Sequence, residues 1–378
     1  MINTVIVIGL VCFDHAIAIT EYHIARISEE VQAKPSLAKL VRVYKAERRR
    51  SHENVIFLHG LSEAVRTVSQ KSQSMYMGSA MFQGGLRIDL LLLYYFCRVM
   101  DDLVDEAPNQ DAAELAIRQC SWALKCRFGE PYATSHPTIL RPPQYDPKPS
   151  WDEPALPSSS ALIYAIDLLP VSRLALAPLL GLIDGFKTDL VFARAGAASP
   201  IATEDDLELY AYNVASVVAV SIVQLVFRHH PPAAPRCPPA EWRARVLEAA
   251  ETMGQALQYV NMARDVERDA AIGRVYLPQA WLSAEGLKPA DVVAAPHDAR
   301  VTKLRMRLLD RADAMYRRSR GAIDELPREA RASVRAVVES YMAIGREVRK
   351  GPRTTGREKL KLSPWRRLWV VWRAMCAR

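Results

Sequence analysis

Hydrophobic positions recur with helical spacing along most of the chain from Glu53 onward, and no convincing run alternates as a strand would. The segment Ile88–Ala107 is almost wholly apolar until its acidic end, which is typical of a helix in the middle of a bundle. The same spacing predicts further helices over Ala112–Arg127, Ser158–Val171, Leu174–Ala193, Glu204–Phe227, Ala240–Asp269, Ala299–Glu325 and Arg328–Arg349. The pattern therefore predicts an all-α protein.

Two proline-rich segments interrupt the helical pattern. They are Pro131–Pro157 and His229–Trp242, and both are predicted to be surface loops because proline cannot continue the interior of a helix. The helices on either side of each loop have the same character, so neither loop is interpreted as a domain boundary. One helical domain is therefore predicted over residues 53–350, followed by a basic, Trp-rich tail over residues 351–378.

The two ends of the chain differ from this domain. Residues 1–22 are predicted as an apolar N-terminal segment, interrupted by Asp14 and His15, whose length is marginal for a membrane span of about 20 residues. It has neither the basic start nor the cleavage site of a secretory signal, so a buried helix, a single membrane anchor and the remnant of a membrane domain all stay open. The tail interleaves three Trp with Arg and Lys, which suits either an anionic membrane surface or a last helix packed on the bundle.

Charge and cysteine content narrow the classes of partner. The net charge of +8 is a modest excess that favours anionic partners such as phosphates or acidic lipid headgroups. Nothing in the sequence resembles a nucleic-acid-reading module, and no nucleic acid is expected as a partner. The six cysteines are scattered without C-x-x-C spacing, so we expect reduced thiols in an intracellular compartment rather than a zinc site or a disulfide framework.

Two pairs of aspartates stand four residues apart, each near the end of a predicted helix. They are Asp101 with Asp105, and Asp265 with Asp269. Like charges at this spacing repel each other, and the C-terminal end of a helix is the unfavourable end for a carboxylate. One such pair alone is most simply a solvated face with ordinary ion pairs. Two pairs that carry the same penalty indicate a missing positive charge, and oxygen ligands of this kind suit Mg²⁺ with substrate phosphates.

Longer motifs surround both pairs. The stretches "YYFCRVMDDLVDE" and "QYVNMARDVERDAAIGRVYLP" resemble the two Asp-rich motifs of the squalene/phytoene synthase family, which are head-to-head prenyl transferases, and the similarity runs from about Glu53 to Arg349. The resemblance implies one large all-α bundle of the isoprenoid synthase type with a central cavity. In this family two isoprenoid diphosphates bind in the cavity, and Mg²⁺ (or Mn²⁺) joins the Asp pairs to the diphosphates.

The resemblance also implies roles for individual residues. The metal ligands would be Asp101, Asp105, Asp265 and Asp269. The substrate-binding residues would be Lys71, Ser72, Ser74, Arg98, Gln258, Asn261 and Arg264. Catalytic roles would fall to Arg98, Arg264, Tyr94, Tyr210 and Tyr276. Arginines suit bidentate contacts with diphosphate, and tyrosine faces stabilise carbocations, although the pattern alone fits ordinary buried tyrosines equally well.

The chain departs from the family pattern at several positions. Gln73 stands where a basic residue is usual, and Met75 replaces an aromatic one. Ser216 and Val217 replace a Gly-Thr pair, and the added side-chain atoms are expected to narrow the cavity or straighten the helix. These departures bear on a phosphate contact and on the preferred chain length of the substrate.

The amino-acid sequences of the two motifs are more similar to those of phytoene synthases than to those of squalene synthases. We therefore expect a Mg²⁺-dependent enzyme that condenses two geranylgeranyl diphosphates, through a cyclopropyl intermediate, to phytoene. No NADPH is expected, because this product forms by proton loss. The alternatives are a squalene or dehydrosqualene synthase, a terpene synthase that uses one diphosphate, or an inactive, chaperone-like member of the family.

The N-terminal segment resembles the junction in fungal bifunctional lycopene cyclase/phytoene synthases, where a membrane cyclase precedes the synthase. Only the end of that cyclase would be present in this chain, so no cyclase activity is predicted. An intracellular, membrane-associated protein is expected, bound peripherally or through a single N-terminal anchor. Downstream carotenoid enzymes are further candidate partners.

Overall fold

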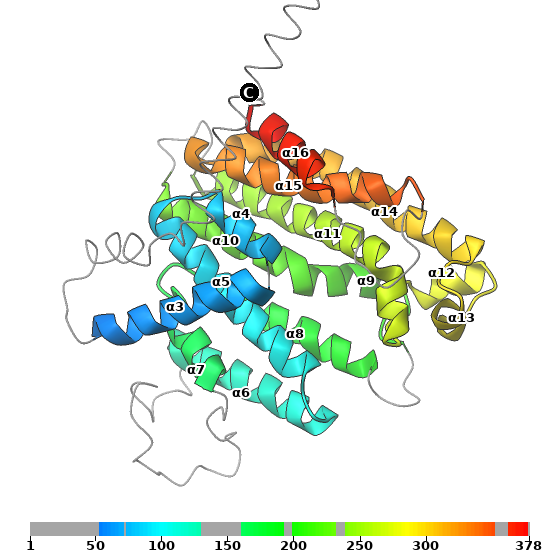
Figure 1. The fold of residues 1–378 in the computed structure, drawn as a ribbon, viewed down its shortest axis with the longest axis horizontal. Coiled ribbons are helices and arrows are strands. Elements are labelled where there is room, and N and C mark those ends of the chain that lie inside the picture. Colours follow the sequence, from blue (N-terminus) through cyan, green and yellow to red (C-terminus); the bar gives the residue numbers. More distant parts are fainter. Residues whose placement is uncertain are drawn as a thin grey trace, which may run out of the picture. The chain divides into compact units, whose positions relative to one another are not determined.

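The computed structural model describes residues 53–71, 73–129, 160–192, 199–231, 239–351 and 362–376. The predicted N-terminal segment and the whole of the predicted loop Pro131–Pro157 lie outside these residues. The chain divides into a first unit, Met1–Glu63, and a second unit, Ala64–Arg378. The described part of the first unit is the beginning of helix α3, Glu53–Lys71, and the second unit holds the remaining helices (Figure 1).

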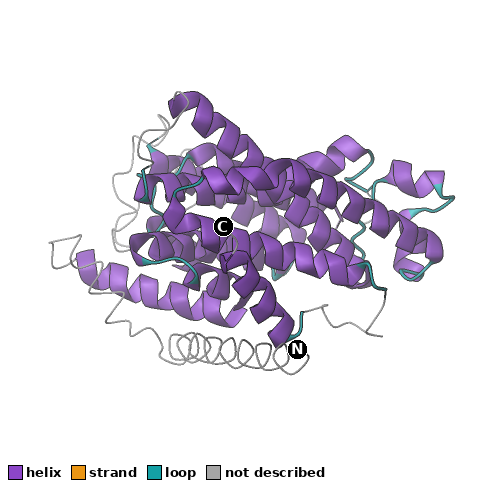
Figure 2. Cartoon of the chain, turned by 90° about the horizontal axis from the view of Figure 1, so that it is seen from above, coloured by secondary structure: helices purple, strands orange, loops and turns teal. Residues whose placement is uncertain are grey.

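The described chain is helical, and it contains no strand (Figure 2). The all-α prediction is therefore confirmed. After α3 the helices are α4 (Gln73–Ala80), α5 (Gly84–Asp105), α6 (Gln110–Phe128), α7 (Ser160–Asp167), α8 (Leu176–Phe192), α9 (Glu204–Ala211), η2 (Tyr212–Ser216), α10 (Val217–His229), α11 (Pro239–Ala271), α12 (Gln279–Ala284), α13 (Pro289–Ala294), α14 (Ala299–Ser319), η3 (Arg320–Glu325), α15 (Arg328–Val348) and α16 (Pro364–Cys376).

Helix α5 is buried on all sides along its middle. Its consecutive residues 88–96 are all buried, and it contacts α4, α6, α7, α8 and α10. A helix without a polar face is stable only when other helices surround it. The same helix ends at Asp105, so its burial places the first acidic motif at the edge of the apolar core.

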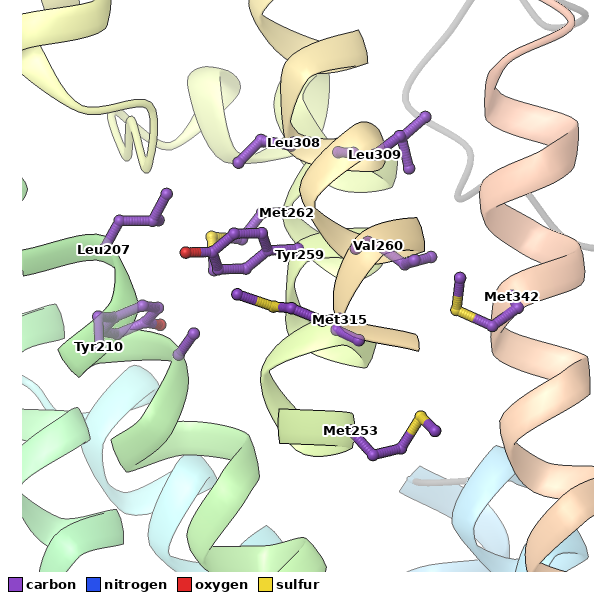
Figure 3. Close-up of a cluster of buried hydrophobic side chains, with 14 of the residues drawn as sticks. Leu207, Tyr210, Met253, Tyr259, Val260, Met262, Leu308, Leu309, Met315 and Met342 are labelled. Carbon is purple, nitrogen blue, oxygen red and sulfur yellow. The ribbon is translucent and has the colours of Figure 1, made fainter. Parts of the chain in front are cut away.

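Helix α11 is the longest helix described, with 33 residues, and it packs along α14 and against α10, η2 and α15. Figure 3 shows the core where these helices meet: Tyr259, Val260 and Met262 of α11 lie among side chains of α9, α14 and α15. Apolar side chains at successive turns of α11 therefore fix the position of the second acidic motif, which follows them at the end of the helix.

The predicted helix Glu204–Phe227 is divided into three parts. It begins at a capping box between Thr203 and Asp206, and a π-helical turn, η2, separates α9 from α10. Ser216 closes this turn, and its hydroxyl donates to the carbonyl of Glu251 at 2.6 Å. The expectation that Ser216 straightens the helix is therefore wrong, because its side chain is bonded to α11 and the π turn is present.

The segment Glu204–His229 is also the one described helical stretch that is long and apolar enough to cross a membrane, and half of its most apolar window is buried. It contacts α5, α8 and α11. Such contacts are those of a core helix in a bundle, which passes the same test of length and composition.

The last described helices form a separate small core. Val370 of α16 and Leu362 before it are buried against Ala343 of α15. Arg366 of α16 also forms an ion pair with the buried carboxylate of Glu347. The tail thus includes a helix that packs on the bundle, while three tryptophans of the same helix stay exposed: Trp365, Trp369 and Trp372.

Candidate active site

The first acidic motif lies at the C-terminal end of α5, where Arg98 neutralises part of its charge. The Arg98 guanidinium forms an ion pair with Asp101 at 2.8 Å, and its Nε donates to Asp102 Oδ1 at 2.8 Å. Lys71 adds a second cation, with its Nζ at 2.7 Å from Asp102 Oδ2. Two of the three cations that the resemblance implied, Arg98 and Lys71, therefore lie at this motif. In the structure they meet on Asp102, to which sequence reasoning assigned no role.

The electrostatics of this motif differ between neighbouring aspartates. Burial raises the pKa of Asp101, and repulsion from Asp105 and Asp102 adds to the rise although Arg98 opposes it. Burial also acts to raise the pKa of Asp102, but hydrogen bonds from Arg98 and Lys71 outweigh it and lower the pKa. Asp101 is therefore the carboxylate that lacks full compensation, and an added cation would stabilise its ionised form.

The second acidic motif lies at the end of α11. Asp265 is buried and accepts two hydrogen bonds from Arg264, at 2.8 Å and 2.5 Å. The Arg264 side chain is also buried, with 8% exposure, so this contact is not the solvated surface pair that one motif alone would suggest. Burial and repulsion from Asp265 raise the pKa of Asp269 to about 7. This motif therefore also holds more negative charge than its protein neighbours compensate.

Arg274 connects the two motifs. Gly273 has a φ of +76°, which lets the chain turn sharply after α11, and the Arg274 N–H donates to the Asp269 carbonyl at 2.8 Å. From this turn the Arg274 guanidinium reaches Asp105 of the first motif, with Nη2 at 2.9 Å from Oδ1. Asp105 and Arg274 are 169 residues apart in sequence, and their ion pair thus joins the two acidic segments.

Gln258 and Asn261 lie upstream of the second motif on α11. The Asn261 amide donates to Gln258 Oε1 at 3.3 Å. The other atom of that amide, Asn261 Oδ1, is buried and has no hydrogen-bond partner among the described residues. A buried acceptor without a donor is costly, so this oxygen is available to a metal-bound water or a cation.

The donor set fits Mg²⁺ with substrate oxygens. Within the described ranges, no three His, Cys, Asp or Glu side chains form a group that would hold an ion alone. The two Asp pairs and the unpaired Asn261 oxygen nevertheless offer only hard oxygen ligands. Mg²⁺ is commonly bound by one or two carboxylates and keeps its other positions for water and phosphate. The predicted metal ligands remain a prediction.

The three predicted catalytic tyrosines fall into two groups. Tyr210 and Tyr276 stack with ring centroids 5.0 Å apart, and both hydroxyls donate to the buried carboxylate of Asp189 in α8. Tyr94 has other neighbours: burial raises its pKa, and Tyr341 and Cys97 contribute to the rise. The charges of Arg264 and Asp265 act in turn on Tyr341. Tyr94 is therefore not part of the Asp189 group in the hydrogen bonds and ring contacts of the described residues.

A small cavity of about 10 Å³ lies beside the second motif. Its polar lining includes Asp269, Arg274 and Tyr276, and its apolar lining includes Met262 and Leu308. Charged groups and hydrocarbon therefore border the same space. At this volume the cavity holds about one water molecule, so it marks where charged groups and hydrocarbon meet and is too small for a prenyl diphosphate.

Ser72 lies outside the described residues, and the side chain of Ser74 is not among those described. The same holds for the side chains of Gln73 and Met75. The predicted substrate contacts of the two serines, and the effect of the two departures beside them, remain predictions.

Sequence reasoning missed four residues of this region: Asp102, Asp189, Arg274 and Tyr341. Arg274 stands inside the quoted Gly-Arg-x-Tyr motif, and its position two residues before Tyr276 was an available signal. Asp189 lies in "GFKTDL", outside the two Asp-rich motifs quoted above. No pattern in the sequence distinguishes Tyr341, because its relation to Arg264 depends on how α15 packs on α11.

Solved structures with the same architecture support the fold assignment. The chain is similar to a dehydrosqualene synthase in complex with ligand, with TM-score 0.63 and 19% identity over 84% of this chain and 96% of that one. It is also similar to a squalene synthase from Alicyclobacillus acidocaldarius, with TM-score 0.58 and 21% identity over 78% of this chain and 95% of that one. At these identities the likeness shows the fold.

Sequence relatives are much closer. A bifunctional lycopene cyclase/phytoene synthase of Aspergillus oryzae is 46% identical over 100% of this chain and 62% of that protein. Its counterpart in Arthroderma gypseum is 42% identical over 99% of this chain and 60% of that protein. The chain thus spans about three fifths of the length of these relatives. The family model for squalene/phytoene synthase matches residues 68–366, and the chain belongs to the squalene/phytoene synthase family.

Proposed function

We propose that this protein is a phytoene synthase, which condenses two geranylgeranyl diphosphates head to head, through a cyclopropyl-bearing diphosphate, and releases diphosphate. The observation that carries the proposal is the Arg274–Asp105 ion pair at 2.9 Å. It joins the two acidic motifs, each of which pairs with an Arg of its own helix, and these carboxylates and guanidinium groups would bind a common diphosphate. The relatives named above, whose names include phytoene synthase, support the choice of product.

Catalysis would need both side chains of this protein and a bound divalent metal. Synthases that condense prenyl diphosphates generally depend on such a metal, and Asp101, Asp105, Asp265 and Asp269 would hold it here. When bound, Mg²⁺ supplies Lewis-acid stabilisation of the leaving diphosphate. Arg98 and Lys71 bind and orient the diphosphate from the first motif, and Arg264 does so from the second.

Water must be kept from the carbocation that remains when diphosphate leaves. Helix α5 before the first motif, helix α11 before the second motif and helix α14, which packs on α11, all carry buried apolar side chains. A dry hydrocarbon wall of this kind excludes water and accommodates a prenyl chain. The tyrosine faces of the site would stabilise the cation by about 0.5–2 kcal/mol each.

The experiment is an incubation of the purified protein with Mg²⁺ and the C15 or C20 prenyl diphosphate, with and without NADPH, followed by identification of the hydrocarbon. Phytoene from the C20 substrate without NADPH is the expected product. A reduced C30 hydrocarbon that forms only with NADPH would instead identify a squalene synthase. No product from either substrate would rule out the enzymatic proposal and favour the inactive alternative.

The metal assignment has its own test. Asp265→Asn keeps the size of the buried side chain but removes its charge, and we expect turnover to fall at least 10³-fold because a metal ligand is lost. Circular dichroism should be unchanged. Arg268, on the same helix, is exposed, and Arg268→Gln is the matched control, which should retain activity. Unchanged turnover of Asp265→Asn would refute the role of this residue as a ligand.

We also propose that the protein acts at an intracellular membrane surface through α16. Helix α16 is fixed to α15 by its buried Val370 and by the Arg366–Glu347 ion pair. It exposes Trp365, Trp369 and Trp372 among basic residues, which is the pattern of a helix lying at an anionic interface. A C40 hydrocarbon product would enter the lipid directly, where downstream carotenoid enzymes would find it.

Flotation with vesicles tests this surface. The protein should float with vesicles that contain anionic phospholipid and much less with neutral ones. The double variant Trp365→Glu, Trp369→Glu should lose flotation at least tenfold and keep its activity on detergent-dispersed substrate. Leu115→Glu, which changes an exposed apolar residue of α6, is the control. Equal flotation of both variants would contradict the proposal.

A further inference from the structure

Asp189 is a buried carboxylate whose partners come from two other segments of the chain. It lies on α8 with 9% exposure. Its Oδ1 accepts hydrogen bonds from the Tyr210 hydroxyl at 3.0 Å and from the Tyr276 hydroxyl at 2.8 Å, and its Oδ2 lies 3.3 Å from the Tyr210 hydroxyl. A buried carboxylate requires such donors, and here they are supplied by α9 and by the segment after α11.

The hydrogen bonds fix the geometry of the two rings. Tyr210 and Tyr276 stack with an interplanar angle of 23°, and Phe192 packs edge-on against Tyr276 with ring centroids 5.0 Å apart. Because both hydroxyls donate to one carboxylate, neither ring can swing away by rotation about its Cα–Cβ bond without losing a buried hydrogen bond, and the packing between the rings limits rotation about each ring's own axis. Three aromatic rings therefore form one wall of defined orientation.

This wall lies next to the charged part of the site. Tyr276 borders the cavity that Asp269 and Arg274 also line. The charge of Arg274 acts on Asp189, and Arg274 is the residue that pairs with Asp105. The rings thus belong to the buried core cluster or pack against it, and Tyr276 also lies beside the groups that would hold the diphosphate in the proposed reaction.

We propose that Asp189 is a positioning residue, which holds Tyr210 and Tyr276 as a fixed aromatic wall against the carbocation formed when diphosphate leaves. The inference rests on the proposed function. In that step the bond between C1 of the prenyl chain and the diphosphate oxygen breaks, the electron pair leaves with diphosphate, and C1 becomes cationic. A ring face that is already oriented stabilises this charge without reorganisation.

The proposal predicts that loss of Asp189 affects the two steps of the reaction differently: ionisation of the diphosphate continues, while coupling of the two prenyl chains is impaired. Without Asp189 the metal and arginine contacts with diphosphate remain, so substrate still binds and ionises. The rings lose their common anchor, and water captures more of the cation. Prenyl alcohol should therefore appear in place of hydrocarbon, while a purely structural role for Asp189 would lower both products together.

The test measures diphosphate released, hydrocarbon and prenyl alcohol from the same reaction. In Asp189→Leu we expect the ratio of hydrocarbon to diphosphate to fall at least tenfold, with the difference recovered as alcohol and with KM changed less than threefold. Asp189→Asn, which keeps an acceptor oxygen, should retain at least a third of the wild-type ratio. The matched control is Asp184→Leu on the exposed side of the same helix, paired only with Lys187 by a described ion pair.

Other outcomes overturn the proposal. An unchanged ratio in Asp189→Leu, or an equal loss in Asp189→Asn and Asp189→Leu, would show that the positioning of the rings is not the role. If Asp189→Leu does not fold, the double variant Tyr210→Phe, Tyr276→Phe removes the same hydrogen bonds and should divert product to alcohol in the same way. Failure of the wild-type protein to release diphosphate would count against the proposed function instead.

Discussion

Arg274 is the residue that joins the two acidic motifs. Its guanidinium carries the charge to Asp105, while its backbone is fixed by the turn that ends α11. Replacing it with Gln should leave the turn intact but remove the charged link. The expected result is a fall in kcat/KM of about 30–100-fold, equivalent to about 2–3 kcal/mol.

Arg274→Lys is the control for this prediction, because it restores a charge without the planar guanidinium. It should recover part of the lost kcat/KM. Steady-state kinetics at saturating Mg²⁺ would measure both variants. Equal activity of wild type and Arg274→Gln would mean that the ion pair is only a surface contact.

Asp167, at the end of α7, is a partly buried carboxyl group away from the site, and its pKa predicts how stability depends on pH. Its Oδ2 is buried without a hydrogen-bond partner among the described residues, and burial raises its pKa from 3.8 to about 6. A carboxyl with a raised folded-state pKa binds its proton more tightly in the folded state. The contribution of Asp167 to the free energy of unfolding therefore falls as pH rises from about 4 to 6, and this contribution is constant above that range.

Asp167→Asn removes this titration. The variant should match the wild type near pH 4 and exceed its free energy of unfolding by about 1 kcal/mol at pH 8, after allowance for partial solvent screening. Urea denaturation at the two pH values would measure the difference. A variant that is less stable than wild type at pH 8 would contradict the prediction.

The positions of single site residues were predictable from the sequence where several of them belong to one short motif on one helix. The aspartates, Arg98 and Arg264 stand at fixed spacing on one helix each, and the structure places all of them at the ends of α5 and α11. Asp189 and Tyr341 were not predictable in this way. Their relation to the site is produced by contacts between helices that are far apart in sequence, and no periodicity records such contacts.

At the scale of elements, the π turn η2 depends on one glycine of the neighbouring helix. A Cβ placed on Gly254 of α11 would lie 2.6 Å from the Ser216 Cα and 2.8 Å from its N. Both are backbone atoms and cannot rotate away. Gly254→Ala should therefore push α11 and η2 apart and lower the free energy of unfolding by about 1–3 kcal/mol.

Gly321→Ala is the matched control, because an added Cβ there meets nothing within 4 Å. It should change stability by less than about 0.5 kcal/mol. Thermal unfolding followed by circular dichroism would compare the two variants. Similar midpoints for both would show that the close approach at Gly254 is relieved without cost.

The predicted helices agree with the structure where apolar spacing is regular, as for Arg328–Arg349 against α15 (Arg328–Val348). They differ where packing overrides that spacing. The predicted helix Glu204–Phe227 contains η2, and the predicted helix Ala299–Glu325 changes to a 3₁₀ helix at Arg320. Neither change alters the apolar pattern enough to be visible in sequence, since the wider π turn of η2 and the tighter 3₁₀ turns of η3 each change the winding only locally.

At the scale of the whole bundle, Asp89 joins helices that are remote in sequence. It is completely buried in α5, and it accepts hydrogen bonds from Arg173 at 2.6 Å and 2.8 Å. The His229 ring, at the end of α10, lies 2.6 Å from its Oδ2. Removing this charge leaves the partly buried Arg173 without its carboxylate, which is strongly destabilising.

Asp89→Asn should therefore lower the free energy of unfolding by about 3 kcal/mol. Asp184→Asn is the control, because it disrupts an exposed ion pair with Lys187 inside α8, and it should cost less than about 1 kcal/mol. Midpoints of thermal unfolding in one buffer would rank the variants. A larger loss in Asp184→Asn than in Asp89→Asn would contradict the assigned role of Asp89.

The architecture of the molecule followed from the sequence because a long apolar helix such as α5 has only one stable environment, the interior of a bundle. The role of the tail did not follow in the same way. Its pattern fitted packing and membrane contact equally, and the structure separates the two faces: Val370 is buried, while Trp365 and Trp369 are exposed.

This division separates five of the seven tryptophans of the unlabelled protein into two optical populations, and Trp122 of α6 is half-buried. Trp242 and Trp281 are buried in the core, whereas Trp365, Trp369 and Trp372 of α16 face solvent. Indole fluorescence shifts to shorter wavelength when the ring leaves water, and rings already shielded by protein have little left to shift. The emission of α16 would therefore report contact with lipid in real time, so that catalysis and docking can be followed in the same cuvette.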